Sequence, residues 1–380
     1  MNEGVGSLMS SEFLNKPGAV DAGDATNTGV AAHYGNPLSE QRELAAGTAI
    51  VDLSHRAVIT ITGPDRLSWI NSLTSQSVAH LAPGESTETL LLEMTGRIEY
   101  AVRLIDDGTD LWLLLEREKA SGLLQWLGSM QFALRVKLAN RSVDFATIGT
   151  LGQPALPVAA PHGLPLVWRD PWMNVSQGGH QYAEATRHPA AGWTYSELLL
   201  PRTKLAGIAA SDIPVAGLLA LEALRIAAWR PSFATEVDDK TIPHELDWLR
   251  TAVHLNKGGY RGQQTVAKVH NVGHPPRRLV MLYLDDTDTV LPSRGDDVVA
   301  LNRDGQDKSV GQVTSVARHF ELGPIALAVI KRGTDPTTEL LVRTTSRDIP
   351  ARQVVIVPPD AGASASVTVP RLPRLGSVPR

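Results

Sequence analysis

The sequence predicts an α+β protein whose C-terminal part is all β. In the first two thirds of the chain, strand-like segments mix with a few helix-like ones, an order typical of α+β layers and not of a doubly wound parallel sheet. After Pro275 and Pro276, the segments are short, strand-like and separated by turn residues. The 380 residues, 43% of them hydrophobic, are enough for a large core and predict two or three domains.

The first strand and helix are predicted on either side of a Gly-Pro-Asp turn. The segment AVITITG at residues 57–63 has strand character. Asp65, at the end of the turn, is a suitable N-cap for a helix that carries Leu67, Ile70 and Leu73 on one face.

A set of strands and a second helix follow. TETLLLEM and GRIEYAVRLI are expected to pair around the tight connection at 95–96, and LWLLLE to form the next strand after the turn DDGTD. A helix that includes the leucines at 123, 124 and 127 comes next, before strands near Val136 and Phe145.

The segment SDIPVAGLLALEALRIAAWRP predicts a long helix. Ser211 or Asp212 is the expected cap, with Pro214 in the first turn and Pro231 as the terminator.

This predicted helix is apolar on nearly every side. Glu222 and Arg225 interrupt the apolar surface, and because they are three residues apart they share a face and can pair. The helix is therefore expected to be buried almost all round, with one polar stripe.

Beyond residue 276, six short strand-like segments predict an all-β barrel or sandwich of about 80 residues. Residues 1–30 and the tail from Ala361 are rich in small and polar residues or in proline, and are expected to be flexible.

Composition excludes several classes of function. The net charge of -4 gives no overall basic field, so general binding to nucleic acid or membrane surfaces is not implied. The absence of cysteine excludes disulfides, thiol nucleophiles and cysteine-ligated metal clusters. The N-terminal stretch lacks an apolar signal core and no apolar run approaches a membrane span, so a cytoplasmic location is expected.

The stretch KGGYRGQQTVAKVHN at 257–271 is the most unusual in the chain. Its three glycines allow close backbone approach and positive φ, and Gln263 and Gln264 stand where a helix would begin. Two interpretations stay open: backbone N–H groups that bind an anion, or a glycine-rich connection with solvated cations. The spacing does not match a P-loop.

The first eight of these residues, KGGYRGQQ, resemble the K-G-C-Y-x-G-Q-E signature of the YgfZ proteins, folate-binding relatives of the glycine-cleavage T-protein (aminomethyltransferase). Residues 33–85 are similar to the opening of the T-protein, with an early Tyr-Gly, then D-L-S-H, then G-x-D before a helix. VGQVTSVARHFELGPIALAVIKR is similar to the barrel strands of the superfamily. The resemblance covers about residues 33–357.

The resemblance implies a fold and a function. The expected fold is a three-lobed ring of α+β subdomains around a central folate cavity, with a C-terminal β-barrel. The expected domains are a flexible segment (1–30), a folate-binding region of two interleaved subdomains (31–275), the barrel (276–358) and a flexible tail (359–380). The expected cofactor is tetrahydrofolate or a one-carbon derivative.

The chain departs from the signature at two positions. Gly259 stands in place of the signature cysteine and Gln264 in place of the glutamate, so this loop cannot act through a thiol. The T-protein aspartate that assists its transfer reaction aligns with Tyr100. Glu99 lies one residue earlier, which on a strand without a bulge turns it to the opposite face, so a solvated strand residue is expected there.

The folate contacts are also predicted from the resemblance. Glu197 in ELLLP matches the glutamate of the T-protein pattern G-x-E-x-x-x-P, and a carboxylate suits the N–H groups of a pterin. Arg225 keeps its place, whereas Leu221 replaces a folate-binding arginine and Ala227 a glutamate. Details of pterin recognition are therefore expected to differ.

The predicted site consists of three folate contacts and one loop, with no catalytic residue. The contacts are Glu197, Arg225 and Tyr100, and the loop, called the signature loop below, is Lys257, Gly258, Gly259, Tyr260, Arg261, Gly262, Gln263 and Gln264. The loop is expected to be a docking surface in which Tyr260 supplies contact area. Its cations would attract the glutamate tail of a folate or an acidic partner.

No metal site is predicted. His244, His254, His270 and His274 lie close in sequence, but Gly273 and Pro275 interrupt the helical spacing of the last two, and no carboxylate set completes a site.

The resemblance implies a tetrahydrofolate-binding accessory protein of one-carbon metabolism that supports iron–sulfur cluster assembly or repair and tRNA-modifying enzymes. Iron–sulfur enzymes or assembly factors are its implied partners. The alternative is a folate-dependent aminomethyl transferase, which the loss of the aspartate at Tyr100 disfavours. A third class, an RNA-binding factor using the basic residues between Arg250 and Arg278, is weakened by Glu245 and Asp247, and tRNA contact is not expected.

Overall fold

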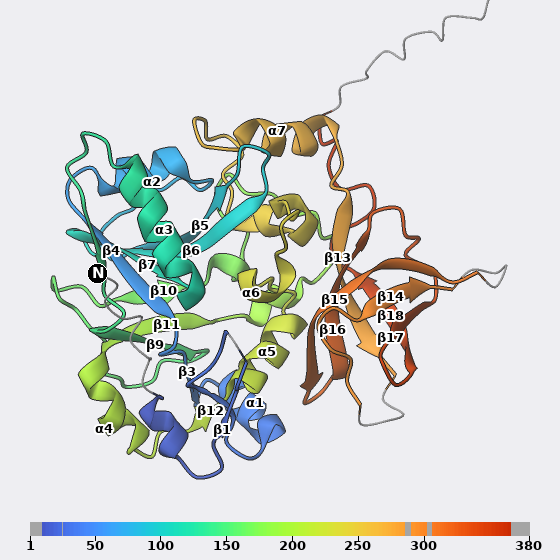
Figure 1. The fold of residues 1–380 in the computed structure, drawn as a ribbon, viewed down its shortest axis with the longest axis horizontal. Coiled ribbons are helices and arrows are strands. Elements are labelled where there is room, and N and C mark those ends of the chain that lie inside the picture. Colours follow the sequence, from blue (N-terminus) through green and yellow to red (C-terminus); the bar gives the residue numbers. More distant parts are fainter. Residues whose placement is uncertain (1–9, 25, 286–289, 302–305, 366–380) are drawn as a thin grey trace, which may run out of the picture.

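The computed structural model describes residues 10–365 except 25, 286–289 and 302–305. Two five-stranded sheets and a closed six-stranded barrel form three lobes, with α5 (Leu218–Ala227) and α6 (Phe233–Glu236) between the sheets and the barrel (Figure 1). This arrangement confirms the predicted α+β class and the C-terminal β-barrel.

The first sheet is antiparallel, in the order β5-β6-β7-β4-β8. The apolar sides of α2 (Arg66–Leu73) and α3 (Arg117–Met130) pack against it through Ile70, Leu123 and Leu127. The predicted strands and both helices are confirmed. Its strands are β4 (Ala57–Thr62), β5 (Ser86–Leu92), β6 (Ile98–Asp106), β7 (Asp110–Leu115) and β8 (Lys137–Asn140).

Asp65 precedes α2 as predicted, but its side chain makes no cap hydrogen bond. Instead the carboxylate accepts hydrogen bonds from the backbone N–H and the guanidinium of Arg135, at 2.7 to 3.1 Å. An opposite charge within reach competes with the helix end for the same oxygens.

The second sheet has the order β10-β11-β9-β3-β12, antiparallel except for the parallel pair β3 and β12. Short helices α1 (Pro37–Ala45) and α4 (Leu205–Ala209) flank it. Its strands are β3 (Ile50–Asp52), β9 (Phe145–Thr150), β10 (Val167–Arg169), β11 (Ser196–Pro201) and β12 (Val215–Ala216).

The predicted start of the long helix at Ser211 or Asp212 is wrong. Residues 215–216 form β12, the carbonyl of Pro214 accepts from the N–H of Ile50 at 3.0 Å, and α5 begins only after Gly217. A β-carbon at Gly217 would lie 2.2 Å from the carbonyl oxygen of Ala32. Sheet pairing and close backbone packing thus take precedence over the capping pattern.

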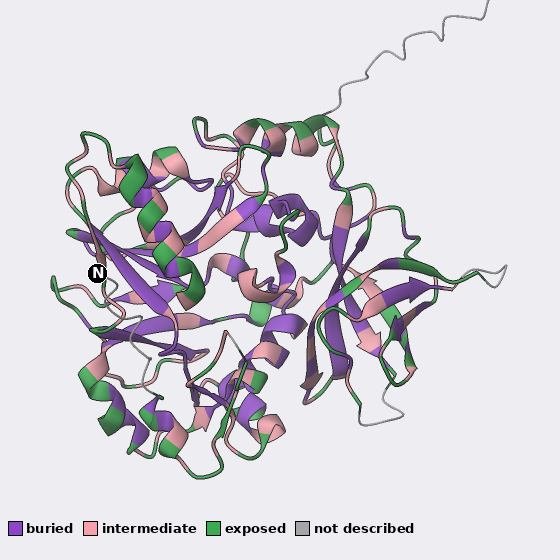
Figure 2. Cartoon of the chain, in the orientation of Figure 1, coloured by how far each residue is buried: buried purple, intermediate pink, exposed green. Residues whose placement is uncertain are grey.

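Most of α5 is buried, as expected, and Figure 2 shows it at the junction of the lobes. Glu222 and Arg225 form the predicted pair, at 2.6 Å. The helix packs on α1 and on β15 of the barrel. Its C-terminal residues therefore lie where the sheets and the barrel meet.

The barrel closes in the order β13-β16-β15-β14-β17-β18, with every neighbouring pair antiparallel. Alternate residues such as Val280, Leu282 and Ala328 fill its interior, whereas the residues between them on β13 and β16 pack outward against the main core. The strands are β13 (Arg277–Leu284), β14 (Asp297–Ala300), β15 (Lys308–His319), β16 (Gly323–Lys331), β17 (Leu340–Arg343) and β18 (Asp348–Val355).

The N-terminal segment is part of the fold, which corrects the prediction of a flexible stretch. A 3-10 helix (Glu12–Asn15) places Phe13 fully inside a core shared with the second sheet. β1 (Val20–Asp21) and β2 (Ala31–His33) form an antiparallel pair. Residues 1–9 and 25 lie outside the described part of the chain.

The start of the predicted tail also packs. Ala361 is buried, and the N–H groups of Ala363 and Ser364 donate to the carbonyls of Gly273 and His270 at the end of α7 (Gln263–Val272). Residues 366–380 lie outside the described residues. Within the described ranges, none of the helices has the length and apolar character needed to cross a membrane. The remaining short 3-10 helices are Pro171–Met173, Pro189–Gly192, Arg202–Lys204, Pro243–Leu246 and Trp248–Arg250.

Candidate functional site

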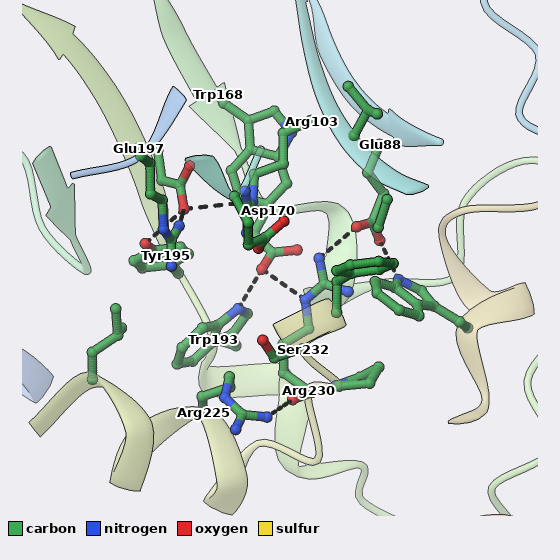
Figure 3. Close-up of a pocket in the computed structure, with 18 of the residues that line it drawn as sticks. Glu88, Arg103, Trp168, Asp170, Trp193, Tyr195, Glu197, Arg225, Arg230 and Ser232 are labelled. Atoms are coloured by element: carbon green, nitrogen blue, oxygen red, sulfur yellow. Dashed lines mark hydrogen bonds and ion pairs between the residues drawn. The ribbon is translucent and has the colours of Figure 1, made fainter. Parts of the chain in front are cut away.

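A small cavity, called the central cavity below, lies between the two sheets and α5 (Figure 3). Its volume is about 60 Å³, below the roughly 300–1,000 Å³ of typical small-molecule pockets. Two hollows of about 300 and 450 Å³ share Glu116 with it. The charged side chains that line the cavity are Arg56, Glu88, Arg103, Glu116, Asp170, Glu197, Glu222, Arg225 and Arg230.

Glu197 is fully buried in β11, between β10 and β9. Its cross-strand partners are Trp168 and Gly149, and a β-carbon at Gly149 would lie 2.9 Å from the hydroxyl of Tyr195. The glycine thus leaves room for Tyr195 beside the carboxylate. The sequence position predicted to contact folate therefore does line the cavity.

One oxygen of the Glu197 carboxylate is fully used and the other is not. Oε1 accepts hydrogen bonds from Arg56 at 2.5 Å and from the hydroxyl of Tyr195 at 2.9 Å, with Arg103 Nε at 3.5 Å (Figure 3). Oε2 is buried and has no partner among the described residues. An unpaired buried acceptor costs free energy, so this oxygen is suited to a donor from a ligand or a water molecule.

The protonation state of this pair follows from its surroundings. Burial favours the neutral acid at Glu197, but Arg103 and Arg56 outweigh it and lower the pKa of the carboxyl. Burial and the neighbouring Glu197 raise the pKa of Tyr195 well above its usual value. At neutral pH the site therefore holds a carboxylate that only accepts and a phenol that donates.

Aromatic rings form one wall of the cavity. The Trp193 and Tyr195 rings are 5.1 Å apart, and Trp168 meets Tyr195 edge to face at 6.3 Å. Arg103 lies over the Trp168 ring, 5.6 Å from its centroid. Flat apolar walls beside a carboxylate suit a planar heterocycle with N–H groups.

A second buried charge cluster adjoins the aromatic wall through Trp193. Arg230 donates to Asp170 at 3.0 Å and to Glu88 at 2.6 Å, and Trp193 donates to Asp170 at 2.8 Å. Burial, opposed by Arg230, raises the pKa of Asp170. Arg230 Nη1 is buried without a partner in the described structure. The cluster fixes the floor of the cavity and leaves one donor open.

Arg225 also lines the cavity, but its hydrogen bonds are used within the fold. Besides Glu222, it binds Glu236 at 2.9 Å, Ser315 Oγ on β15 at 2.8 Å and the carbonyl of Arg230 at 2.7 Å. The structure therefore brings Arg225 to the same cavity as Glu197, and shows it as a link between α5 and the barrel.

Tyr100 does not join this group. Its hydroxyl faces α3, where a β-carbon at Gly122 would lie 2.8 Å away, and its ring packs with the core on the helix side of the first sheet. The structure therefore does not place Tyr100 beside Glu197, where a folate contact was expected. Strand alternation explains this, because Ala101 and Arg103 occupy the cavity side.

Glu99 is not simply a solvated strand residue, as was expected. Leu91 pairs with Tyr100 and Leu92 with Ile98, so Glu99 is the extra residue of a β-bulge. The bulge directs its carboxylate to Arg261, at 3.0 Å, and to the rim of the 450 Å³ hollow.

The signature loop is held by its own polar groups. The ammonium of Lys257 donates to the carbonyl of Thr74 and lies 4.8 Å from the centroid of Tyr260, and burial lowers the pKa of Lys257 to about 8. Gln263 accepts from the N–H of Gly259 at 2.8 Å and donates to the carbonyl of Lys257. The loop thus closes on itself at the start of α7.

The expected docking role of Tyr260 is wrong, because the side chain is only 7% exposed and belongs to the main core. Arg261 pairs with Glu99 and is not an open cation. Gly262 has φ of 83°, and a β-carbon there would lie 2.5 Å from the carbonyl oxygen of Glu93. Gly258, Gly259 and Gln264 form the exposed part of the loop.

Of the four histidines singled out in the sequence, His244 and His270 both pack near the Tyr182 ring, with centroids 6.4 and 5.9 Å from it. His270 belongs to α7, whereas His274 follows its end and binds the carbonyl of Ala361. Of the described residues, Asp107, Asp110 and His162 are the group whose ligand atoms all lie within 4.8 Å of one another. Asp107 already accepts from the Trp112 indole and from two backbone N–H groups, so this group stabilises a turn.

Sequence reasoning missed Glu88, Arg103, Asp170 and Arg230. A signal for two of them exists in the sequence. Glu88 and Arg103 are charged residues within strand-like segments that are otherwise largely apolar, and charged residues are rarely buried unless they are paired. Asp170 and Arg230 lie in irregular segments, where no periodicity indicates burial.

Comparisons with known proteins agree with this geometry. Residues 277–358 match the family described as the glycine cleavage T-protein C-terminal barrel domain. The chain is 27% identical to an aminomethyltransferase of Herpetosiphon aurantiacus over 349 residues, which is 86% of this chain and 90% of the relative. It is 25% identical over 369 residues to a chloroplastic protein of Arabidopsis thaliana with a provisional transferase name, covering 91% and 81% of the two chains.

The fold is similar to a solved structure as well. The glycine cleavage system aminomethyltransferase T of Bartonella henselae matches 92% of this chain and 96% of its own, with a TM-score of 0.69 and 20% sequence identity. The chain is therefore similar to aminomethyltransferases over most of its length, and its residues 277–358 match the T-protein barrel domain.

Proposed function

We propose that the protein binds a reduced folate in the central cavity and serves as a YgfZ-type accessory protein for iron–sulfur cluster assembly or repair and for tRNA-modifying enzymes. The observation that carries the folate part is the unpartnered Oε2 of the buried, ionised Glu197, beside Trp168 and Tyr195. A pterin offers a flat ring and neighbouring N–H donors, which suit such an acceptor.

The accessory role is favoured over transfer chemistry by the residue at position 100. A phenol on the helix side of the first sheet supplies no carboxylate to the cavity. The second candidate is a folate-dependent aminomethyl transferase, which the names of the relatives favour. The signature loop, with Gly259 in place of the signature cysteine, would contribute structure and not thiol chemistry.

Calorimetric titration with tetrahydrofolate and its 5-formyl derivative tests folate binding. Glu197→Gln should weaken binding by about 1 to 3 kcal/mol, because a charge-assisted hydrogen bond is lost. Glu118→Gln, an exposed change beside the adjoining hollows, is the control and should leave affinity unchanged. Equal affinity of Glu197→Gln and wild type would remove Glu197 from the site.

Two assays separate the accessory role from the transferase. The accessory role predicts that the wild-type protein restores the activity of an iron–sulfur enzyme in a bacterium lacking its YgfZ protein. It also predicts no aminomethyl transfer from a lipoyl carrier to tetrahydrofolate above the uncatalysed rate. Aminomethyl transfer by the purified protein, without restored activity of the iron–sulfur enzyme in the bacterium, would favour the transferase.

A further inference from the structure

Arg103 occupies the space in which a planar ligand would stack. It projects from β6 into the central cavity, and its guanidinium lies over the Trp168 ring, 5.6 Å from the centroid (Figure 3). The remaining volume of about 60 Å³ admits little more than water. The cavity is thus filled by one of its own side chains.

Arg103 is held more loosely than its neighbour Arg56. Its side chain makes no hydrogen bond with any described residue, and its two ion pairs, with Glu116 and with Glu197, are both 3.5 Å long. Its Nη1 is buried without a described partner. Arg56 binds the same Glu197 oxygen at 2.5 Å. Ion pairs of this length, without directed hydrogen bonds, fix the position of the Arg103 guanidinium less tightly than the short contact fixes that of Arg56.

A second position for the guanidinium is at hand. Glu116 borders the central cavity and both adjoining hollows, of about 300 and 450 Å³. Moving toward Glu116, Arg103 would keep one counter-ion while leaving both the Trp168 face and Glu197. No other arginine of the cavity combines these features, because Arg56, Arg225 and Arg230 each donate hydrogen bonds to carboxylates.

We propose that Arg103 is a displaceable plug of the central cavity. A ligand with a flat heteroaromatic head and N–H donors replaces the guanidinium over Trp168 and beside Glu197, and Arg103 moves onto Glu116. The identity of the ligand as a reduced folate rests on the proposed function; the plug itself rests on the geometry of Arg103. Because binding requires an open state, the plug slows association and selects for ligands able to replace both contacts.

Arg56 provides a matched control. Its side chain is as exposed as that of Arg103, at 19%, and both cations act on Glu197. Replacing either by alanine removes one positive charge from the carboxylate. Only Arg103 covers Trp168, so a difference between the two variants reports the plug and not the charge.

The first test is stopped-flow tryptophan fluorescence with 5-formyltetrahydrofolate. Arg103→Ala should associate faster than wild type by about tenfold, which corresponds to an open population near one tenth. Arg56→Ala should not associate faster. An Arg103→Ala variant that associates no faster than wild type, while wild type binds, would overturn the plug and leave folate binding intact. Absence of binding by every variant in calorimetry would instead overturn the proposed function.

The second test needs no ligand. Acrylamide quenching of Trp168, taken as the difference between each protein and its Trp168→Phe version, should increase in Arg103→Ala and stay at the wild-type level in Arg56→Ala. Equal quenching in all three proteins would overturn the plug whatever the folate result. If circular dichroism shows that Arg103→Ala does not fold, Arg103→Gln is used in its place, because this change also shortens the side chain and removes its charge. The same results are expected, and the same results would overturn the plug.

Discussion

The central cavity and the signature loop use their polar side chains in opposite ways. In the loop, Lys257, Arg261 and Gln263 each have a partner within the fold. Around the cavity, Glu197 Oε2, Arg103 Nη1 and Arg230 Nη1 are buried and have no partner among the described residues.

This difference separates a recognisable motif from the capacity to bind a ligand. The loop carries the residues that resemble a known signature, yet it mainly fixes the start of α7 against the β5–β6 connection. The cavity is built largely from side chains that no motif marks, and three of its buried hydrogen-bonding atoms have no partner among the described residues. The following measurements test this contrast.

The largest expected effect is at the buried cluster of the cavity. Arg230→Met leaves Glu88 and Asp170 buried without their cation, and should lower the free energy of unfolding by about 3 to 5 kcal/mol. The loop counterpart Arg261→Met removes a pair that is about one third exposed on each side, and should cost about 1 kcal/mol or less. Urea titration measures the free energy of unfolding of both variants. Similar losses in the two would contradict the contrast between the cavity and the loop.

Within the loop, two glycines with positive φ should differ. Gly262→Ala places a β-carbon 2.5 Å from the Glu93 carbonyl oxygen at φ 83°, and should cost about 3 kcal/mol. Gly259→Ala, at φ 75° with no atom within 4 Å, should cost only about 1 kcal/mol. Thermal melts of the two variants measure both losses. Equal shifts in melting temperature would mean that the strain of a positive φ, and not the contact with Glu93, sets the cost.

A smaller, pH-dependent effect is expected at Asp247, which precedes Trp248 of the cavity lining. Burial raises its pKa to about 7, above the roughly 3.9 of an exposed aspartate. Its contribution to stability is therefore present below about pH 4 and is lost as the pH rises through about 7.

Asp247→Asn removes this titration, keeps the acceptor for the Tyr182 N–H at 2.6 Å and gives up only the longer one, for the Ala183 N–H at 3.3 Å. Asparagine also tolerates the φ of 55°. The variant should exceed wild type in free energy of unfolding by about 1 to 3 kcal/mol at pH 8, with a smaller difference at pH 4.5. Urea titrations at the two pH values measure it. A pH-independent difference would show that Asp247 does not titrate in this range.

The sequence predicted strands and helices well wherever apolar residues gather in a run or on one side of a helix. The apolar runs in β4, β5 and β7, which are buried on both faces, and the leucines of α3 gave their positions. The start of α5 was wrong since Pro214 and its neighbours pair with β3, a contact between residues more than 160 positions apart. Such pairing leaves no local pattern.

The candidate site was predictable only in part. Glu197 was found through a resemblance in its pattern, and the structure does place it at the cavity. The bulge at Glu99, which goes with Tyr100 facing α3, depends on the register between β5 and β6 and could not be seen in a single strand. Phe13 shows the same limit, because a lone aromatic in a polar stretch gives no periodic signal of burial.

The network around Arg225 has a consequence for how the chain could be divided. Residues 277–358 match a domain family by themselves, yet Glu236 accepts hydrogen bonds from Thr314 and Ser315 of β15, and Arg277 binds Glu245 and Asp238. The described residues that line the central cavity all precede residue 277. A chain cut at 276 would keep every described residue that lines the cavity, but Arg225 would lose its hydrogen bond to Ser315. The barrel thus supports the binding site from outside, through the end of α5, without lining the cavity itself.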